Sequence, residues 1–341
     1  MMKMKLGVWQ FAALFAMALL GTTHLTGYEW LRFFTYFGSW GTVGLIFAGL
    51  SMTWICYKLA KIMDQHEVDS ISELFQKVLG PIISPTFRFL FYAISFGYIG
   101  YLFSSEAARL SQWFPWSGVF NALLIGIFVG LLLQLKVHRL IGLVASCLIM
   151  CAVYFSLMLL KQQHIEIPSF AYQFNSWWLF RTFLFISAHL LLSLIIFLPA
   201  ARLVPTTSER VKGIWLGGGI FTIVALLCHA ILLTYWHDVH SSTQPLILIS
   251  SQLFTGSHIL YHMLSFIYSL LYIGIWTLFL TNMLSERFDL RHNPIRYLVL
   301  LLLICLSVLY IVLPWIGTIT LLAGAYVGGV FLVFVFWKLK R

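Results

Sequence analysis

The sequence predicts an all-α membrane protein in which ten transmembrane helices form two inverted repeats of five helices each. Three observations lead to this prediction: the composition, the length of the apolar stretches, and the repeated spacing of those stretches along the chain. Apolar residues make up 61% of the 341 residues and charged residues only 9%, whereas soluble domains average about 45–50% and about 25%. The apolar stretches are continuous and do not alternate with polar residues, so they predict membrane helices rather than barrel strands.

Ten stretches are long and apolar enough to be membrane spans. The loops between them are short, so we expect one integral membrane domain. We assign residues 1–162 to the first five-helix repeat and residues 163–341 to the second. The spans are predicted at residues 7–34, 39–62, 83–110, 118–135, 139–160, 178–200, 213–236, 257–284, 295–313 and 315–337.

The basic residues sit mainly in the short loops between the spans. Lysine and arginine total 21 against 11 acidic residues, which gives a net charge of +10. Most of the basic residues fall on one side when the N-terminus is placed in the cytoplasm, as the positive-inside rule requires. We therefore expect a multi-pass protein of the cell (plasma) membrane with both termini in the cytoplasm. Its surroundings are membrane lipids and no nucleic acid is expected as a partner, while the oligomeric state does not follow from this pattern.

Cysteines and glycines within the spans are interpreted as packing residues. No C-x-x-C pair occurs, so neither a metal site nor a disulfide framework is expected, and buried cysteines otherwise behave as small apolar side chains. The cysteines are Cys56, Cys147, Cys151, Cys228 and Cys305. Glycines in spans 7 and 10 indicate close helix contacts; they are Gly217, Gly218, Gly219, Gly324, Gly328 and Gly329.

The second half of the chain repeats the spacing of the first half. Spans 2 to 5 and spans 7 to 10 begin 174 to 177 residues apart. The connectors repeat as well: a capping box at Ser70–Glu73 opens a short helix that ends before Gly80, and Gln244-Pro245 opens a second short helix. Because five is an odd number, the second half enters the membrane from the opposite side. Such inverted repeats are typical of secondary transporters.

The first span contains a polar segment between two glycines at membrane depth. Glycine and β-branched threonine are weak helix formers, so we predict that this helix is discontinuous. The freed backbone groups need partners, and a polar substrate and a coupling ion can supply them. The alternative is a continuous helix whose threonine hydroxyls bond to the preceding turn. The candidate substrate-binding residues are Gly21, Thr22, Thr23, His24, Leu25, Thr26 and Gly27.

This segment opens a longer motif that resembles a known family. The motif is Gly21-x-x-x-x-x-Gly27-x-Glu29-x-x-x-Phe33-Phe34-x-x-x-Gly38-x-Trp40-Gly41. It resembles the opening motif of the YkvI-like bacterial membrane proteins, which belong to the amino acid–polyamine–organocation superfamily. The resemblance implies a five-plus-five inverted-repeat transporter fold. Where the family has Phe-Ala-Ser before the second glycine, this chain has His24, Leu25 and Thr26, and the resemblance carries no substrate with it.

Span 6 is the counterpart of span 1 in the second repeat, so we predict that it is discontinuous too. Its polar residues Ser187, His189 and Ser193 are the further candidates for substrate binding. We expect His24 and His189 to face a shared central cavity, because intramembrane polar groups often mark transport pathways. A histidine can also carry a coupled proton. The alternative for each histidine is an ordinary hydrogen bond between helices.

Span 8 carries the candidate ion-coupling hydroxyls, Thr277 and Thr281. The resemblance implies a sodium site in which two adjacent hydroxyls of span 8 face carbonyl groups of span 1. This chain has Leu278 after Thr277, so one hydroxyl is missing. The coupling ion is therefore left as Na+ or H+, with His24 or His189 as the proton carrier in the second case. The threonines can also be plain helix-packing residues.

Four charged residues near the outer ends of spans 1 and 3 are candidates for a gate over the substrate. Glu29 and Arg32 are three residues apart, as are Glu106 and Arg109, and this spacing allows an ion pair on one helix face. The alternative is that these charges simply reach the aqueous interface.

The sequence as a whole predicts a secondary active transporter of a small polar solute, either an amino acid or an amine-like compound. We expect ion-coupled transport, as in a symporter, by alternating access, with Na+ or H+ as coupling ion and without a cofactor. An enzyme is not expected, because no nucleophile–base pair, phosphate loop or pair of carboxylates is visible. The main alternative is a ligand-sensing membrane receptor subunit of the same superfamily without net transport, and a scaffold protein is a third possibility.

Overall fold

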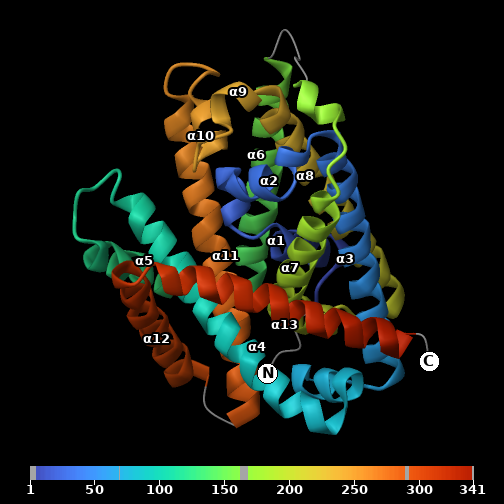
Figure 1. Ribbon diagram of the computed structural model, residues 1–341. Helices are drawn as coiled ribbons and strands as arrows, with labels where there is room; N and C mark the ends of the chain where they lie inside the picture. Colours follow the sequence, from blue (N-terminus) through green and yellow to red (C-terminus); the bar gives the residue numbers. More distant parts are fainter. Residues whose placement is uncertain (1–4, 69, 162–167, 289–291, 340–341) are drawn as a thin grey trace.

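A computed structural model describes residues 5–68, 70–161, 168–288 and 292–339, and the regular structure within these residues is helical (Figure 1). Eight of the described helices are long and apolar enough to cross a membrane, and two shorter apolar helices, α1 (Val8–Leu20) and α5 (Gly118–Leu132), accompany them. These ten segments match the predicted spans. The predicted boundary between the repeats, at residues 162 and 163, lies outside the described residues.

The first span is broken, as predicted. It consists of α1 (Val8–Leu20), the short 3-10 helix η1 (Thr23–Thr26) and α2 (Tyr28–Phe33). The break is flanked by glycines with positive φ angles, 65° at Gly21 and 83° at Gly27, a region that side chains other than glycine rarely enter. At about 1.5 Å per residue, α1 is too short to cross the bilayer without η1 and α2.

The rest of the first half follows the predicted order. After η2 (Thr35–Phe37), Ser70 Oγ accepts a hydrogen bond from Glu73 N at 3.1 Å and caps α4 as the capping box predicts. Gly80, with φ 81° and ψ 170°, divides α4 into the predicted short helix and span 3. The longer elements are α3 (Ser39–Gln65), α4 (Ile71–Leu110), α5 (Gly118–Leu132) and α6 (Val137–Leu160).

The second half contains one departure from the prediction. Span 6 is the continuous helix α7 (Trp177–Arg202), so the predicted interruption of this span is wrong. Ser187 and Ser193 bond to carbonyls of their own helix. The positions between them hold an alanine, a histidine and three leucines, and no glycine opens the backbone. The remaining elements are η3 (Ser169–Tyr172), α8 (Thr207–Thr234), α9 (Trp236–Val239), α10 (Pro245–Ser250), α11 (Ser257–Phe288), α12 (His292–Val312) and α13 (Trp315–Leu339).

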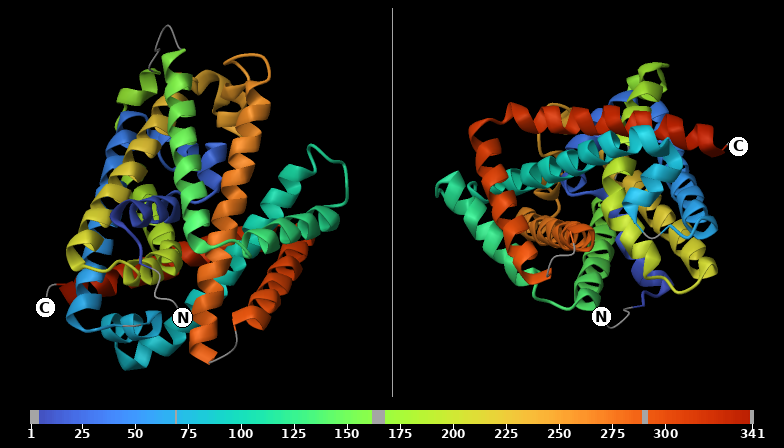
Figure 2. Two further views of the ribbon diagram at one scale, coloured as in Figure 1. Left: turned by 180° about the vertical axis from the view of Figure 1, so that it is seen from behind. Right: turned by 90° about the horizontal axis from the view of Figure 1, so that it is seen from below.

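Helix contacts follow the symmetry of the predicted inverted repeat. The broken first span packs on α8 through α1, and its counterpart α7 packs on α3. Likewise α13 packs on α4 and α7, while α6 packs on α11 and α1; α13 crosses obliquely in Figure 1, and α6 and α11 lie side by side in Figure 2. The contacts α4–α5 and α12–α4 recur as α11–α12 and α5–α11. Exchanging each span with the span five places later therefore reproduces these contacts.

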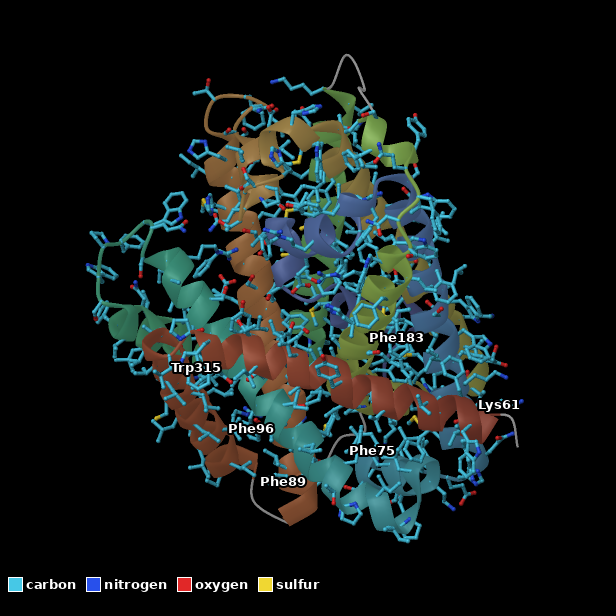
Figure 3. The ribbon with its side chains drawn as sticks, in the orientation of Figure 1. Lys61, Phe75, Phe89, Phe96, Phe183 and Trp315 are labelled. Atoms are coloured by element: carbon cyan, nitrogen blue, oxygen red, sulfur yellow. The ribbon has the colours of Figure 1, made fainter. Side chains whose placement is uncertain are left out.

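The two ends of the helical bundle are distinct. The start of α1 and the end of α13 lie toward the end opposite α9 and α10 (Figures 1 and 2), and Leu6 N donates to Leu203 O just after α7. Lys61 and the aromatic core around Phe75 also lie toward this end (Figure 3). An even number of spans explains why the start of α1 and the end of α13 lie toward the same end of the bundle.

Candidate functional site

The break in span 1 is buried under elements of the second repeat. Tyr261 of α11 donates its hydroxyl hydrogen to the carbonyl of Leu25, at 2.6 Å. Gly27 lies against α10 so closely that a Cβ atom there would come within 3.0 Å of both Leu246 and Pro245. The freed backbone of the break is thus partly satisfied by a tyrosine, and α10 covers it.

A carboxylate and an imidazole meet beside this break. Glu29 of α2 and His189 of α7 approach to 3.4 Å between Oε2 and Nε2, with side-chain exposures of 15% and 10%. The ring of Phe185 stacks on the imidazole with centroids 4.2 Å apart. Two titratable groups at membrane depth, from the two helices that are equivalent in the two repeats, make this pair the centre of the candidate site.

Tyrosines from the other two central helices surround Glu29. The hydroxyls of Tyr98 on α4 and Tyr272 on α11 are hydrogen-bonded to each other, and both lie within electrostatic range of Glu29. Tyr101, one turn further along α4, also lies within electrostatic range of Glu29. The site therefore has one acidic group, one imidazole and several aromatic faces, a set that suits a cation or an ammonium group.

A polar seam runs outward from these tyrosines between α4 and α11. Glu106 and Arg109 form the ion pair that their spacing predicts, at 2.5 Å, with both side chains 7% exposed. Arg109 also donates to Ser265 Oγ at 3.1 Å, and Ser269 lies near the Glu106 carboxylate. Both charges of the seam lie on α4, and the hydrogen bond from Arg109 to Ser265 ties α4 to α11.

The four predicted gate residues do not form one cluster. Glu29 faces His189, whereas the guanidinium of Arg32 lies 5.2 Å from the ring centre of Tyr28 and 5.1 Å from that of Tyr36. The expected Glu29–Arg32 pairing is thus replaced by cation–π contacts for Arg32. Glu106 and Arg109 belong to the seam. A gating role for these residues remains a prediction.

The predicted substrate-binding residues are only partly brought together. Thr22 is buried, and Thr26 Oγ1 accepts a hydrogen bond from Tyr28 N at 3.3 Å. The side chains of Thr23 and His24 lie outside the described part of the structure, so the predicted meeting of His24 with His189 is untested. Of the polar residues in α7, His189 reaches the site, whereas the carbonyl of Ser187 abuts Gly328 of α13.

Helical spacing places Thr277 and Thr281 on the face of α11 opposite Tyr268, and their role in ion coupling remains a prediction. Nine residues, or two and a half turns, separate Thr277 from Tyr268, which lines a small cavity with Gly21. Thr281 follows seven residues after Gly274, which faces Leu132 of α5. Both hydroxyls donate to carbonyls one turn earlier, at 2.8 and 2.6 Å. This placement favours helix packing over a shared sodium site with span 1.

Sequence reasoning missed three features of the site. It assigned Glu29 to a gate, although a lone carboxylate two residues after the second glycine of the break indicates a residue at the centre of the candidate site. It gave no role to Tyr98 and Tyr272, which carry no local signal because tyrosines are common throughout the chain. It also gave no role to His229, which bridges Thr35 and Thr42. Among the described residues, no group of three or more His, Cys, Asp or Glu side chains is arranged to hold a metal ion.

Removing the charge of Arg109 is expected to destabilise the protein strongly. The variant Arg109→Met leaves the buried Glu106 carboxylate without its counter-charge, which costs about 3–5 kcal/mol. Thermal unfolding of the purified protein in detergent measures this loss. Arg88→Met on the same helix, where the side chain is only half-buried, is the control. The double variant Arg109→Met, Glu106→Gln should recover part of the loss, and an Arg109→Met protein as stable as the wild type would contradict the structural role of the pair.

The architecture resembles that of membrane transporters of known structure. A substrate-bound, outward-open Na+-coupled sialic acid symporter superposes with a TM-score of 0.69 at 12% identity, covering 97% of this chain and 79% of that chain. The manganese transporter of Eremococcus coleocola, in complex with an aromatic bis-isothiourea substituted compound, gives a TM-score of 0.58 at 14% identity and covers 98% and 76%. A mutant of the same transporter gives 0.59 at 15% identity and covers 97% and 76%.

No family model and no curated protein matches the sequence. The structural likeness nevertheless extends over nearly the whole chain, and its described helices include eight that can span a membrane. The chain is therefore a multi-pass membrane protein with a multi-helix transporter fold.

Proposed function

We propose that this protein is a secondary active transporter that carries a small amine-bearing solute, an amino acid or an amine, across the plasma membrane by alternating access. The observation that carries the proposal is the Glu29–His189 pair beside the broken first span. Two titratable side chains at this depth would be costly if they had no role in binding or proton transfer. The transporter fold and the transport activities named for the similar structures support the same class.

The chemistry around Glu29 supports an ammonium group as the recognised part of the solute. A carboxylate gives a charge-assisted hydrogen bond to an ammonium group, and the rings of Phe185 and Tyr98 offer aromatic faces nearby. Carbonyls of the break between Gly21 and Gly27 can accept further hydrogen bonds. A carboxylate or sugar acid alone would meet repulsion from Glu29.

We propose the proton as the coupling ion. Glu29 Oε2 and His189 Nε2 lie 3.4 Å apart, and an imidazole is the side chain best suited to carry a coupled proton near neutral pH. The sialic acid symporter is Na+-coupled, but Thr277 and Thr281 of this chain lie on the face of α11 opposite Tyr268. Sodium coupling is therefore the competing outcome of the experiment.

The test uses the full chain in detergent and then in liposomes. A thermal-shift panel of amino acids and small alkylamines identifies a ligand, and accumulation of that ligand, radiolabelled, is measured with a pH gradient or a sodium gradient across the membrane. We expect accumulation to follow the pH gradient and to persist when sodium is replaced by choline. Accumulation that needs a sodium gradient would reject proton coupling. Saturable binding without accumulation would instead indicate the sensing receptor, and no response to any amine would reject the substrate class.

We also propose that the chain belongs with the YkvI-like proteins and has both termini in the cytoplasm. The residues that carry the resemblance have structural reasons to be there, which supports the assignment. Gly27 and Gly38 have positive φ angles, Trp40 stacks on Trp178 with centroids 6.0 Å apart, and a Cβ atom on Gly41 would lie 1.9 Å from the carbonyl oxygen of Phe34. Cysteine-accessibility labelling from either side of the membrane tests the orientation.

A further inference from the structure

We propose that His229 is a positioning residue that holds the outer half of span 1, and with it Glu29, in place. This inference rests on the proposed function only in giving Glu29 its importance. The hydrogen bonds that carry it involve other residues. His229 lies on α8 and is 2% exposed.

Both ring nitrogens of His229 are used. Nδ1 lies 3.0 Å from Thr35 Oγ1 in η2, and Nε2 lies 2.8 Å from Thr42 Oγ1 in α3. The Thr35 hydroxyl donates its single hydrogen to the carbonyl of Trp30, at 3.2 Å. With this hydrogen committed to Trp30, the neutral tautomer protonated at Nδ1 donates to Thr35, and its Nε2 accepts the hydrogen of Thr42. The backbone of Gly38 is a further hydrogen-bond partner of the ring. One neutral tautomer satisfies the whole chain of hydrogen bonds.

Helix α2, which these hydrogen bonds hold in place, is too short to be stable by itself. Helix α2 has six residues and no side-chain cap at its N-terminus, and isolated helices shorter than about 12 residues are marginal. Its orientation must come from contacts at its two ends. Tyr261 binds Leu25 just before α2, and the His229–Thr35–Trp30 chain binds the carbonyl end of α2 itself. Glu29 precedes Trp30 directly, so a shift of this end displaces the carboxylate from His189.

The two amide variants of His229 separate its two hydrogen bonds. Asparagine places its amide near the position of Nδ1 and can keep the bond to Thr35, whereas glutamine places its amide near Nε2 and can keep only the bond to Thr42. Phenylalanine fills the space and removes both. Thr35→Val and Thr42→Val remove the partners one at a time. Thr234→Val is the control, because that hydroxyl of α8 bonds within its own helix to Ala230 O.

The readouts need no substrate. Amide hydrogen exchange of residues 28–37 reports the stability of α2, and the rate of dicyclohexylcarbodiimide modification of Glu29, read by peptide mass spectrometry with Glu29→Gln as blank, reports the placement of the carboxylate. Loss of one buried hydrogen bond should accelerate both by about five-fold. We expect this acceleration in His229→Phe, His229→Gln and Thr35→Val. We expect wild-type rates in His229→Asn, Thr42→Val and Thr234→Val.

Two results would overturn the proposal. One is wild-type exchange and labelling in a folded His229→Phe or Thr35→Val protein. The other is a Thr42→Val effect as large as that of Thr35→Val, which would mean that His229 supports the bundle generally and does not act on α2. If His229→Phe fails to fold, Thr35→Val carries the test alone, since it exchanges only a hydroxyl for a methyl group. If the uptake experiments showed no proton coupling or no amine binding, the proposed function would be contradicted, whereas these exchange results would stand.

Discussion

Replacing Glu29 by glutamine is expected to reduce accumulation of the amine substrate by at least about 100-fold, since removing one partner of a desolvated charge pair costs about 3 kcal/mol or more. Glutamine keeps the size and one hydrogen-bond acceptor but removes the negative charge that faces His189, at 3.4 Å. The ammonium group of the solute then loses its counter-charge. Initial uptake rates into liposomes, at equal amounts of reconstituted protein, measure the effect.

The expected pH response separates binding from proton coupling. In the wild type, uptake that is driven by protons should change with external pH. In Glu29→Gln and in His189→Gln the residual uptake should become insensitive to pH, and the double variant should be no worse than the worse single variant, because the two side chains act as one unit. Glu67→Gln, on the exposed surface, is the control for loss of a carboxylate. Wild-type uptake in Glu29→Gln would exclude this residue from the substrate site.

The substitution Gly328→Ala is expected to destabilise the protein more than a glycine-to-alanine substitution at any other glycine of α13. A Cβ atom at Gly328 would lie 2.0 Å from the carbonyl oxygen of Ser187 and 2.6 Å from its carbonyl carbon. Backbone atoms of a helix cannot rotate away as a side chain can, so α13 must move off α7. Overpacking of this kind costs about 3 kcal/mol or more when the neighbour cannot relax.

Helix α8 supplies a matched control for this substitution. Gly219 is also in the middle of a membrane helix, but a Cβ atom there would meet nothing within 4 Å. Gly219→Ala should leave the unfolding temperature unchanged or raise it, because alanine is the better helix former by about 1 kcal/mol. Unfolding temperatures of the two variants in the same detergent decide the matter. Equal stability of Gly328→Ala and the wild type would show that α13 does not pack on α7 in this way.

The sequence alone determined the number and limits of the spans, because a bilayer requires long apolar helices and leaves few other ways to bury the backbone. It also determined the break in span 1, since two glycines enclose a polar segment that has no strong helix former. The inverted repeat followed from the spacing of the spans and of the two short connector helices. The spacing of Glu106 and Arg109 predicted their ion pair, because i and i+3 residues share a helix face wherever the helix lies.

Only the tertiary structure decided which polar residues share the site. The continuity of α7 could not be predicted from symmetry, because the two repeats share their packing but not their local sequence, and α7 lacks the glycines of span 1. Glu29 meets His189, and Tyr98 meets Tyr272, through contacts between residues more than 150 positions apart. Which face of α11 carries Thr277 and Thr281 depends on the rotation of that helix about its axis. Such rotations are set by the packing of all neighbouring helices at once, and no local pattern records them.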